Sequence, residues 1–273
     1  GFPGGSRPGG HSPRTMIGRL FNLVLIILLA PALYAFVYEG ALFVVAVSTW
    51  DAFLWFLGGI VLSLFVYVPF LSGKIGFIEH LLHEFEHAAL AFLFTFKLPT
   101  KLEIEPEKGS KVEAPKGGGC VRALAPYYLP LLTLPFLLGK ALISLALSWL
   151  QLPFPPAVAG VLDGLMGATW IFHSVCTLKE FHLKQTDITK TGVIASFIAV
   201  LFLNFMFVVL IVAVVTGAYA EFVDYLQAAL PAAVDAYQAV LDFAQTRVLP
   251  MASDWIQTLK DQFCLQCTPT PTP

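Results

Sequence analysis

Long apolar segments are the feature that most constrains the fold of this 273-residue chain. A helix needs roughly 20 mostly apolar residues to cross the hydrocarbon core of a bilayer. Hydrophobic residues make up 57% of the chain and charged residues only 12%, about half the charged share of an ordinary soluble domain. Six segments approach or exceed the spanning length: 17–38, 52–72, 75–97, 123–149, 156–177 and 191–217. We therefore predict an all-α polytopic membrane protein with about six transmembrane helices.

The composition between these segments divides the chain into four parts. Residues 1–16 are rich in glycine and proline and are predicted to form a flexible arm, while 17–217 form a membrane-embedded domain. Residues 218–263 carry acids spaced between apolar residues, which is typical of amphipathic helices at a membrane surface or against a partner. Residues 264–273 are predicted to be a disordered tail. Their lone C-x-x-C pair is a weak signal that fits a metal site, a redox pair or coincidence, with coincidence or a local disulfide favoured.

The most polar long interval, 98–119, directly follows the third apolar segment. Side chains alternate in KLEIE and KVEA on either side of Lys108-Gly109-Ser110. This pattern predicts a short β-hairpin in the loop.

The charge balance narrows the class of partner. The formal net charge is −2, and no basic stretch resembles a phosphate-binding surface. Nucleic acid is therefore not an expected partner. We expect the partners to be the lipid bilayer and other transmembrane helices, either as substrate or as neighbouring subunits.

Three of the six histidines fall within eight residues, in IEHLLHEFEHAALAFLF. On a helix that turns about 100° per residue, His83 and His87 lie roughly 40° apart and one turn along the axis. Both imidazoles can therefore reach one ion. This is how H-E-x-x-H binds zinc, with Glu84 placed to take a proton from a water at the metal. The motif predicts a Zn²⁺ site.

The ionisable side chains around the motif share one face of the predicted helix. Glu79, His80, Glu84 and Glu86 fall with the two histidines within less than half of the circumference, and apolar residues fill the rest. Such groups at membrane depth normally face a bundle interior or a wet cavity. His80 and Glu86 are candidates to hydrogen-bond the metal ligands, and equally to line the path by which water reaches them.

A catalytic zinc site usually takes three protein ligands and leaves the fourth position to water. Asp187 is the first candidate for the third ligand, because it directly precedes the last apolar segment and can lean into the helix bundle. Asp163, in GVLDG, is the alternative third ligand. His173 and Glu180 are further candidates. Each of the four could instead cap a helix or join two helices by a hydrogen bond.

These features together resemble the site-2-protease-like (M50) family of membrane zinc metallopeptidases. The likeness covers about residues 75–210 and rests on LLHEFEHAALAFLF, the polar loop after it, ALAPYYLPLL and an aspartate at a later span. It implies zinc bound by His83, His87 and Asp187, Glu84 as the catalytic base, and hydrolysis of peptide bonds in membrane-spanning substrates. PFPPAVAGVLDG loosely resembles the sequence pattern in which the family carries its third zinc ligand. This likeness would make Asp163 the third ligand in place of Asp187. The loop with Asp187 is more similar to the compact bacterial branch, which implies a multi-pass protein of the bacterial inner membrane.

Other functions fit parts of the same pattern. Glu84-x-x-His87 matches half of a di-iron carboxylate site, but the sequence holds no second Glu-x-x-His. Haem ligation by His80 or His173 is another possibility. The chain could also be a catalytically silent scaffold of the same family, or a subunit of a larger membrane complex, with a structural or non-zinc metal site.

Overall fold

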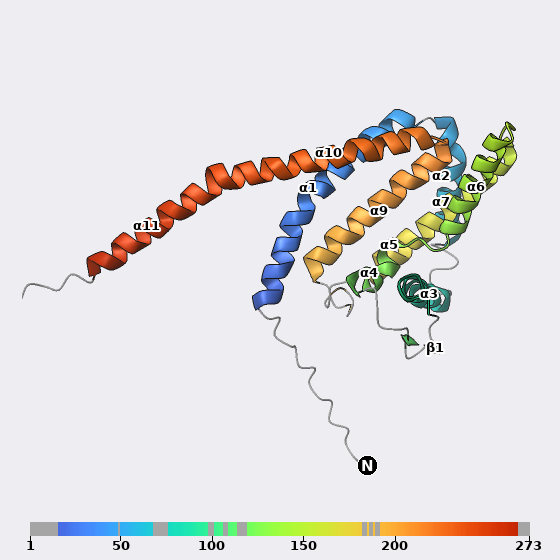
Figure 1. Ribbon diagram of the computed structural model, residues 1–273. Helices are drawn as coiled ribbons and strands as arrows, with labels where there is room; N and C mark the ends of the chain where they lie inside the picture. Colours follow the sequence, from blue (N-terminus) through green and yellow to red (C-terminus); the bar gives the residue numbers. More distant parts are fainter. Residues whose placement is uncertain are drawn as a thin grey trace, which may run out of the picture.

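The computed structural model describes residues 16–48, 50–67, 76–97, 101–105, 109–113, 119–181, 185, 188 and 192–266. This part of the chain is mainly α-helical, as the sequence predicts, and two short strands accompany the helices (Figure 1). The helices in chain order are α1 (Met16–Val47), α2 (Trp50–Val66), α3 (Gly76–Thr95), α4 (Gly119–Ala123), α5 (Ala125–Tyr128), α6 (Leu134–Trp149), α7 (Pro156–Glu180), α9 (Val193–Thr216), α10 (Tyr219–Phe243) and, after the π-helical turn η2 (Ala244–Val248), α11 (Leu249–Gln266).

Three helices of the described part are long and apolar enough to cross a membrane. They are Leu29–Val47 within α1, the whole of α7 and the whole of α9. Helices α2 and α6 are apolar but shorter, and α3 carries three glutamates. Three of the six predicted spans are thus supported by length and composition, and the count of six stays a prediction.

Helices α2 and α7 touch through their backbones. A Cβ atom added to Gly59 would lie 1.9 Å from the carbonyl oxygen of Gly164, and one added to Gly167 would lie 2.0 Å from that of Phe56. Gly160 similarly receives the Trp55 ring, which would lie 2.8 Å from an added Cβ. Small residues allow such close approach between membrane helices. We call this contact the glycine seam; it fixes α7 against α2.

A buried ion pair joins α6, α7 and α9. Nζ of Lys140 donates to both carboxylate oxygens of Asp163, at 2.6 and 2.8 Å, and to the carbonyl oxygen of Val215 at 3.0 Å. Lys140 and Asp163 are only 6% and 5% exposed. The acceptor on α9 lies in its last turn, where backbone carbonyls lack helical partners and favour a cation.

The C-terminal helices lie on the outside of the helix bundle. Helix α10 packs along α1, with Tyr225 among Phe36, Phe43 and Phe222, and α11 extends beyond it, away from the other helices (Figure 1). These two helices cover the interval in which the sequence predicts amphipathic helices. Residues 1–15 and 267–273, which include nearly all of the predicted arm and most of the predicted tail, lie outside the described residues.

Two strands follow α3. β1 (Lys101–Glu105) pairs antiparallel with β2 (Gly109–Glu113), with Lys101 opposite Glu113 and Glu105 opposite Gly109. They lie in the interval where the sequence predicts a hairpin, while its turn, 106–108, lies outside the described residues. β2 lies close to α3, so the strand pair is a neighbour of the helix that carries the histidines.

Candidate metal centre

Helix α3 presents the two motif histidines side by side. The ring centres of His83 and His87 lie 5.0 Å apart, and the ring planes are inclined by 82°. A tetrahedral metal that takes one nitrogen from each ring at about 2.0–2.1 Å would hold the ring centres roughly 5 Å apart. The spacing of the two rings therefore fits a shared metal ion, as the helical spacing predicts.

The Nδ1 atoms of both rings face oxygen acceptors. Nδ1 of His83 lies 2.5 Å from Oε2 of Glu180, and Nδ1 of His87 lies 2.9 Å from the carbonyl oxygen of Arg122. A backbone carbonyl can only accept a hydrogen bond, so Nδ1 of His87 must carry the proton. A neutral ring then has its lone pair on Nε2. Histidines that bind metals in proteins usually show this arrangement, because the acceptor at the other nitrogen fixes the tautomer and the ring orientation. Nδ1 of His83 makes no hydrogen bond to the described residues, and it is close to Glu180 by distance alone.

The acceptors come from two different parts of the fold. Arg122 belongs to the short helix α4, whose terminal carbonyls have no helical partners, and Glu180 is the last residue of α7. The Tyr127 ring of α5 packs edge-on against His83 at 5.8 Å and against Phe181 at 5.4 Å. His83 is thus held between an aromatic ring and a carboxylate.

The predicted base and the predicted supporting residues have different positions. Glu84 directly follows His83 on α3 and is partly exposed, and the side chain of His80 lies outside the described residues. Glu86 is 6% exposed; its Oε1 lies 3.6 Å from Nδ1 of His173, and it accepts a hydrogen bond from the backbone N–H of Leu131. Glu86 therefore contacts α7, and its support of the metal ligands stays a prediction.

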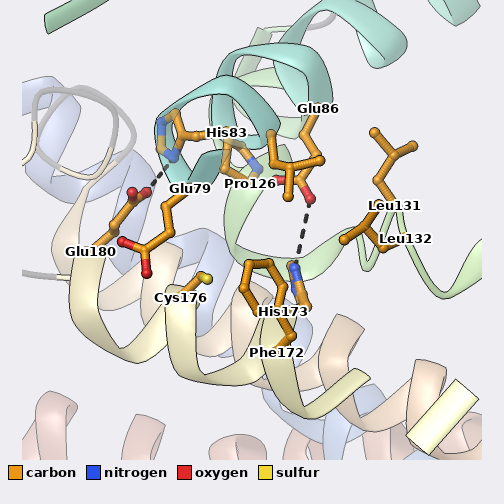
Figure 2. Close-up of a pocket in the computed structure, with 11 residues that line it drawn as sticks. Glu79, His83, Glu86, Pro126, Leu131, Leu132, Phe172, His173, Cys176 and Glu180 are labelled. Atoms are coloured by element: carbon orange, nitrogen blue, oxygen red, sulfur yellow. Dashed lines mark ion pairs between the residues drawn. The ribbon is translucent and has the colours of Figure 1, made fainter. Parts of the chain in front are cut away.

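A small pocket lies between α3 and α7 beside these residues (Figure 2). It leaves about 20 Å³ in which the centre of a water molecule can lie, which is enough for about one water molecule. Its polar and titratable lining consists of Glu79, His83, Glu86, His173, Cys176 and Glu180. Glu79 is paired with Lys179 at 2.8 Å and accepts a hydrogen bond from Tyr67. Three carboxyl groups thus line one small pocket, and those of Glu79 and Glu86 already have Lys179 and His173 as partners.

The third ligand is the part of the predicted site that the structure does not assemble. No group of three metal-binding side chains converges in the part of the chain that the structure describes. Asp187 lies outside the described residues. Asp163 is buried against Lys140, roughly 25 Å from Glu180 along α7 at about 1.5 Å per residue. The structure therefore does not bring Asp163 to the histidines, and its charge is already used by Lys140.

Sequence reasoning identified some of these residues but not their contacts. Glu180 and His173 are candidates from the sequence, and the structure brings both to the pocket, where they face His83 and Glu86. Cys176 is a pocket residue that the sequence did not single out. The spacing of positions 173, 176 and 180 places them on one face of an apolar helix, and this polar stripe is a signal that could have found the pocket. No such signal exists for the Arg122 carbonyl, since every residue carries a backbone carbonyl.

Comparison with known proteins adds no relative. No family model, no curated protein and no solved structure matches the chain.

Proposed function

We propose that this chain is an intramembrane zinc metalloprotease that hydrolyses peptide bonds of membrane-spanning substrates. The observation that carries the proposal is the pair of imidazoles on α3, whose ring separation suits one metal ion. The hydrogen bond between Nδ1 of His87 and the Arg122 carbonyl leaves Nε2 of that ring to a metal. In this proposal His83, His87 and Asp187 hold the zinc. The likeness to site-2-protease-like metallopeptidases supports it through the H-E-x-x-H helix and the strand pair that follows.

The residues would divide the chemistry as follows. Bound zinc supplies a Lewis acid that polarises a carbonyl and acidifies water. Glu84, next to His83, accepts the proton of the attacking water and returns it to the leaving amine. Tyr127 and Phe181 pack beside His83 and restrict access of bulk water to it. A helical substrate must unwind first, because its carbonyls are bonded internally, and the β1–β2 pair is the element that would hold it extended.

The proposal includes the membrane topology. In this proposal α2, α3 and α6 also cross the membrane, which gives six spans together with the three long apolar helices. The chain would then be a multi-pass protein of the bacterial inner membrane. The polar face of α3 supports this, since His83 and Glu86 contact α7 and His87 contacts α4, as expected for ionisable groups at membrane depth.

The test of catalysis is the substitution Glu84→Gln, with Glu86→Gln as the matched control on the same helix. The reporters are single-span membrane proteins with a tag on each side, co-expressed with the full chain. We expect Glu84→Gln to abolish cleavage and to retain zinc, and Glu86→Gln to keep both. Cleavage by the Glu84→Gln variant at the wild-type rate would reject Glu84 as the base.

The test of the metal is elemental analysis of the purified protein. We expect about one zinc per wild-type chain and per Asp163→Ala chain, and loss of zinc in Asp187→Ala, since a site of this class needs three protein ligands. Loss of zinc in Asp163→Ala alone would reverse the choice of third ligand. A wild-type protein without metal would favour the silent scaffold, and a coloured protein with iron would favour the di-iron or haem alternatives.

A further inference from the structure

We propose that the C-terminal helices α10 and α11 bind the surface of the lipid bilayer through one continuous apolar face. The inference is independent of the metal site. Helix α11 extends away from the other helices (Figure 1), and nearly all of its side chains that the structure describes are exposed. Several of them are large and apolar: Met251 is 72% exposed, Trp255 66% and Ile256 49%. A contiguous exposed apolar surface usually marks an interaction site.

The π-helical turn η2 aligns the two helices. A π turn holds about one residue more than an α-helical turn, so it sets α11 back by about 100° relative to an uninterrupted helix. Without it, Asp254 would lie about 120° from Asp242 around the axis, whereas with it the two lie within about 20° of each other. Val240 and Leu259 would similarly lie about 100° apart, and the π turn brings them into line. The turn therefore joins two amphipathic helices into one amphipathic surface.

The acids of the two helices all lie on one side of this surface. With the π turn counted, they fall within about 70° of one another around the axis. These acids are Glu221, Asp224, Asp235, Asp242, Asp254 and Asp261. The large apolar residues lie on the other side: Val240 is about 160° from Asp242, and Ile256 is about 160° from Asp254. A helix with this division lies on a bilayer and does not cross it, because its acids must stay in water.

The exposed apolar face continues a face that is already packed. In the first half of α10, Tyr225, Ala229 and Ala233 are buried, and Tyr225 packs among aromatic side chains of α1. Val240 lies within about 20° of Ala233 around the axis, and Phe243 lies in line with Tyr225. Helix α1 is long and apolar enough to cross a membrane, and so is α9, which ends directly before α10 begins. The uncovered half of the face thus extends from a contact with a membrane-length helix.

The width and the charges of this face favour lipid over a second copy of the chain. On α11 the face runs from Met251 to Ile256, about 140° around the axis, which is wider than the narrow seam of a two-helix coiled coil. Lys260 lies one turn after Ile256 at one margin, and Arg247 lies one turn before Met251 at the other. Basic side chains at these margins can reach lipid phosphates while their stems lie along the apolar surface.

The experiment places an environment-sensitive fluorophore on single cysteines of the full chain in liposomes, after the four native cysteines are replaced by alanine. Ile256→Cys reports on the apolar face, and Asp254→Cys is the matched control on the opposite side of α11. Val161→Cys is the positive control, because Val161 is exposed on the membrane-length helix α7. A quencher attached to lipid acyl chains measures contact with the hydrocarbon. We expect blue-shifted emission and quenching at position 256 as at position 161, and several-fold weaker quenching at position 254.

Every other result would overturn the inference. Emission typical of water at position 256 would show that the face is uncovered. Blue-shifted emission without lipid quenching would show that protein covers the face, and energy transfer between donor- and acceptor-labelled chains would identify a second copy. Equally strong quenching at positions 254 and 256 would show that α11 is immersed in the hydrocarbon and not held at its surface. Absence of quenching at position 161 would reject the bilayer as the surroundings of α7, and the inference would fail with it.

Discussion

The two ends of α7 carry ionisable side chains that the structure treats in opposite ways. In the first half, Asp163 is matched by one lysine and one carbonyl in a closed network. In the last two turns, His173, Cys176 and Glu180 line a pocket in which acids outnumber lysines and arginines. An ionisable residue in a membrane helix is usually taken as a sign of function. The contrast teaches that surroundings matter as much as charge: Asp163 and Lys140 tie helices together inside the packing, whereas the ionisable groups at the other end of α7 line a cavity.

The largest expected effect is at the pocket end and concerns the metal. His87→Ala removes one of the two motif ligands, so zinc content should fall from about one per chain to almost none. Elemental analysis of the purified variant measures this. The apo protein should unfold like wild type, within about 1 kcal/mol, because His87 is only partly buried. Full zinc content in this variant would show that the metal binds elsewhere. The two ends of α7 would then not differ in metal binding.

At the opposite end of α7, a substitution should lower the free energy of unfolding and leave metal binding unchanged. Asp163→Ala leaves Lys140 buried without its counter-ion, which costs about 3–5 kcal/mol of unfolding free energy. Denaturant unfolding in mixed micelles measures the loss, and zinc content should stay at the wild-type level. The double variant Lys140→Met with Asp163→Leu should recover most of the stability. A double variant as unstable as the single one would show that the charges themselves are not what Lys140 and Asp163 contribute.

The contact between Glu86 and His173 should have an intermediate effect. His173→Leu takes away a polar neighbour of a buried carboxylate, and the expected cost is about 1–3 kcal/mol in the same unfolding assay. Glu86→Gln in the His173→Leu background should restore part of it, since a neutral amide is cheaper to bury. An unchanged stability in His173→Leu would mean that the Leu131 N–H alone satisfies Glu86.

The smallest effect is expected at Lys179, which is 42% exposed and pairs with Glu79. A partly exposed ion pair contributes only about 0.2–1 kcal/mol. Lys179→Met should lower the unfolding free energy by no more than that and leave zinc affinity within about twofold. A loss of several-fold in zinc affinity would show that Glu79, once unpaired, disturbs the metal ligands, and it would extend the metal centre to this pair.

The sequence predicted the parts of the site that depend on local geometry. The placement of His83 and His87 on one face of a helix follows from helical spacing alone, and the structure confirms it. The contacts of Asp163 could not be predicted, because they depend on how α6 and α9 pack against α7. The first apolar segment was predicted as 17–38, whereas α1 runs from Met16 to Val47 and packs against α10.

The glycine seam has a consequence for the length of α7. Gly160, Gly164 and Gly167 lie within about 60° of one another around the helix axis, whereas His173, Cys176 and Glu180 lie roughly 180–240° from Gly167. The glycine seam and the pocket therefore lie on opposite sides of α7. Contact with α2 sets the rotation of α7 about its axis, and with it the side on which Glu180 meets His83. One residue inserted between Gly167 and His173 would turn the pocket side by about 100° relative to the seam. Positions 168–172 thus form a spacer whose number of residues sets the pocket side relative to the seam.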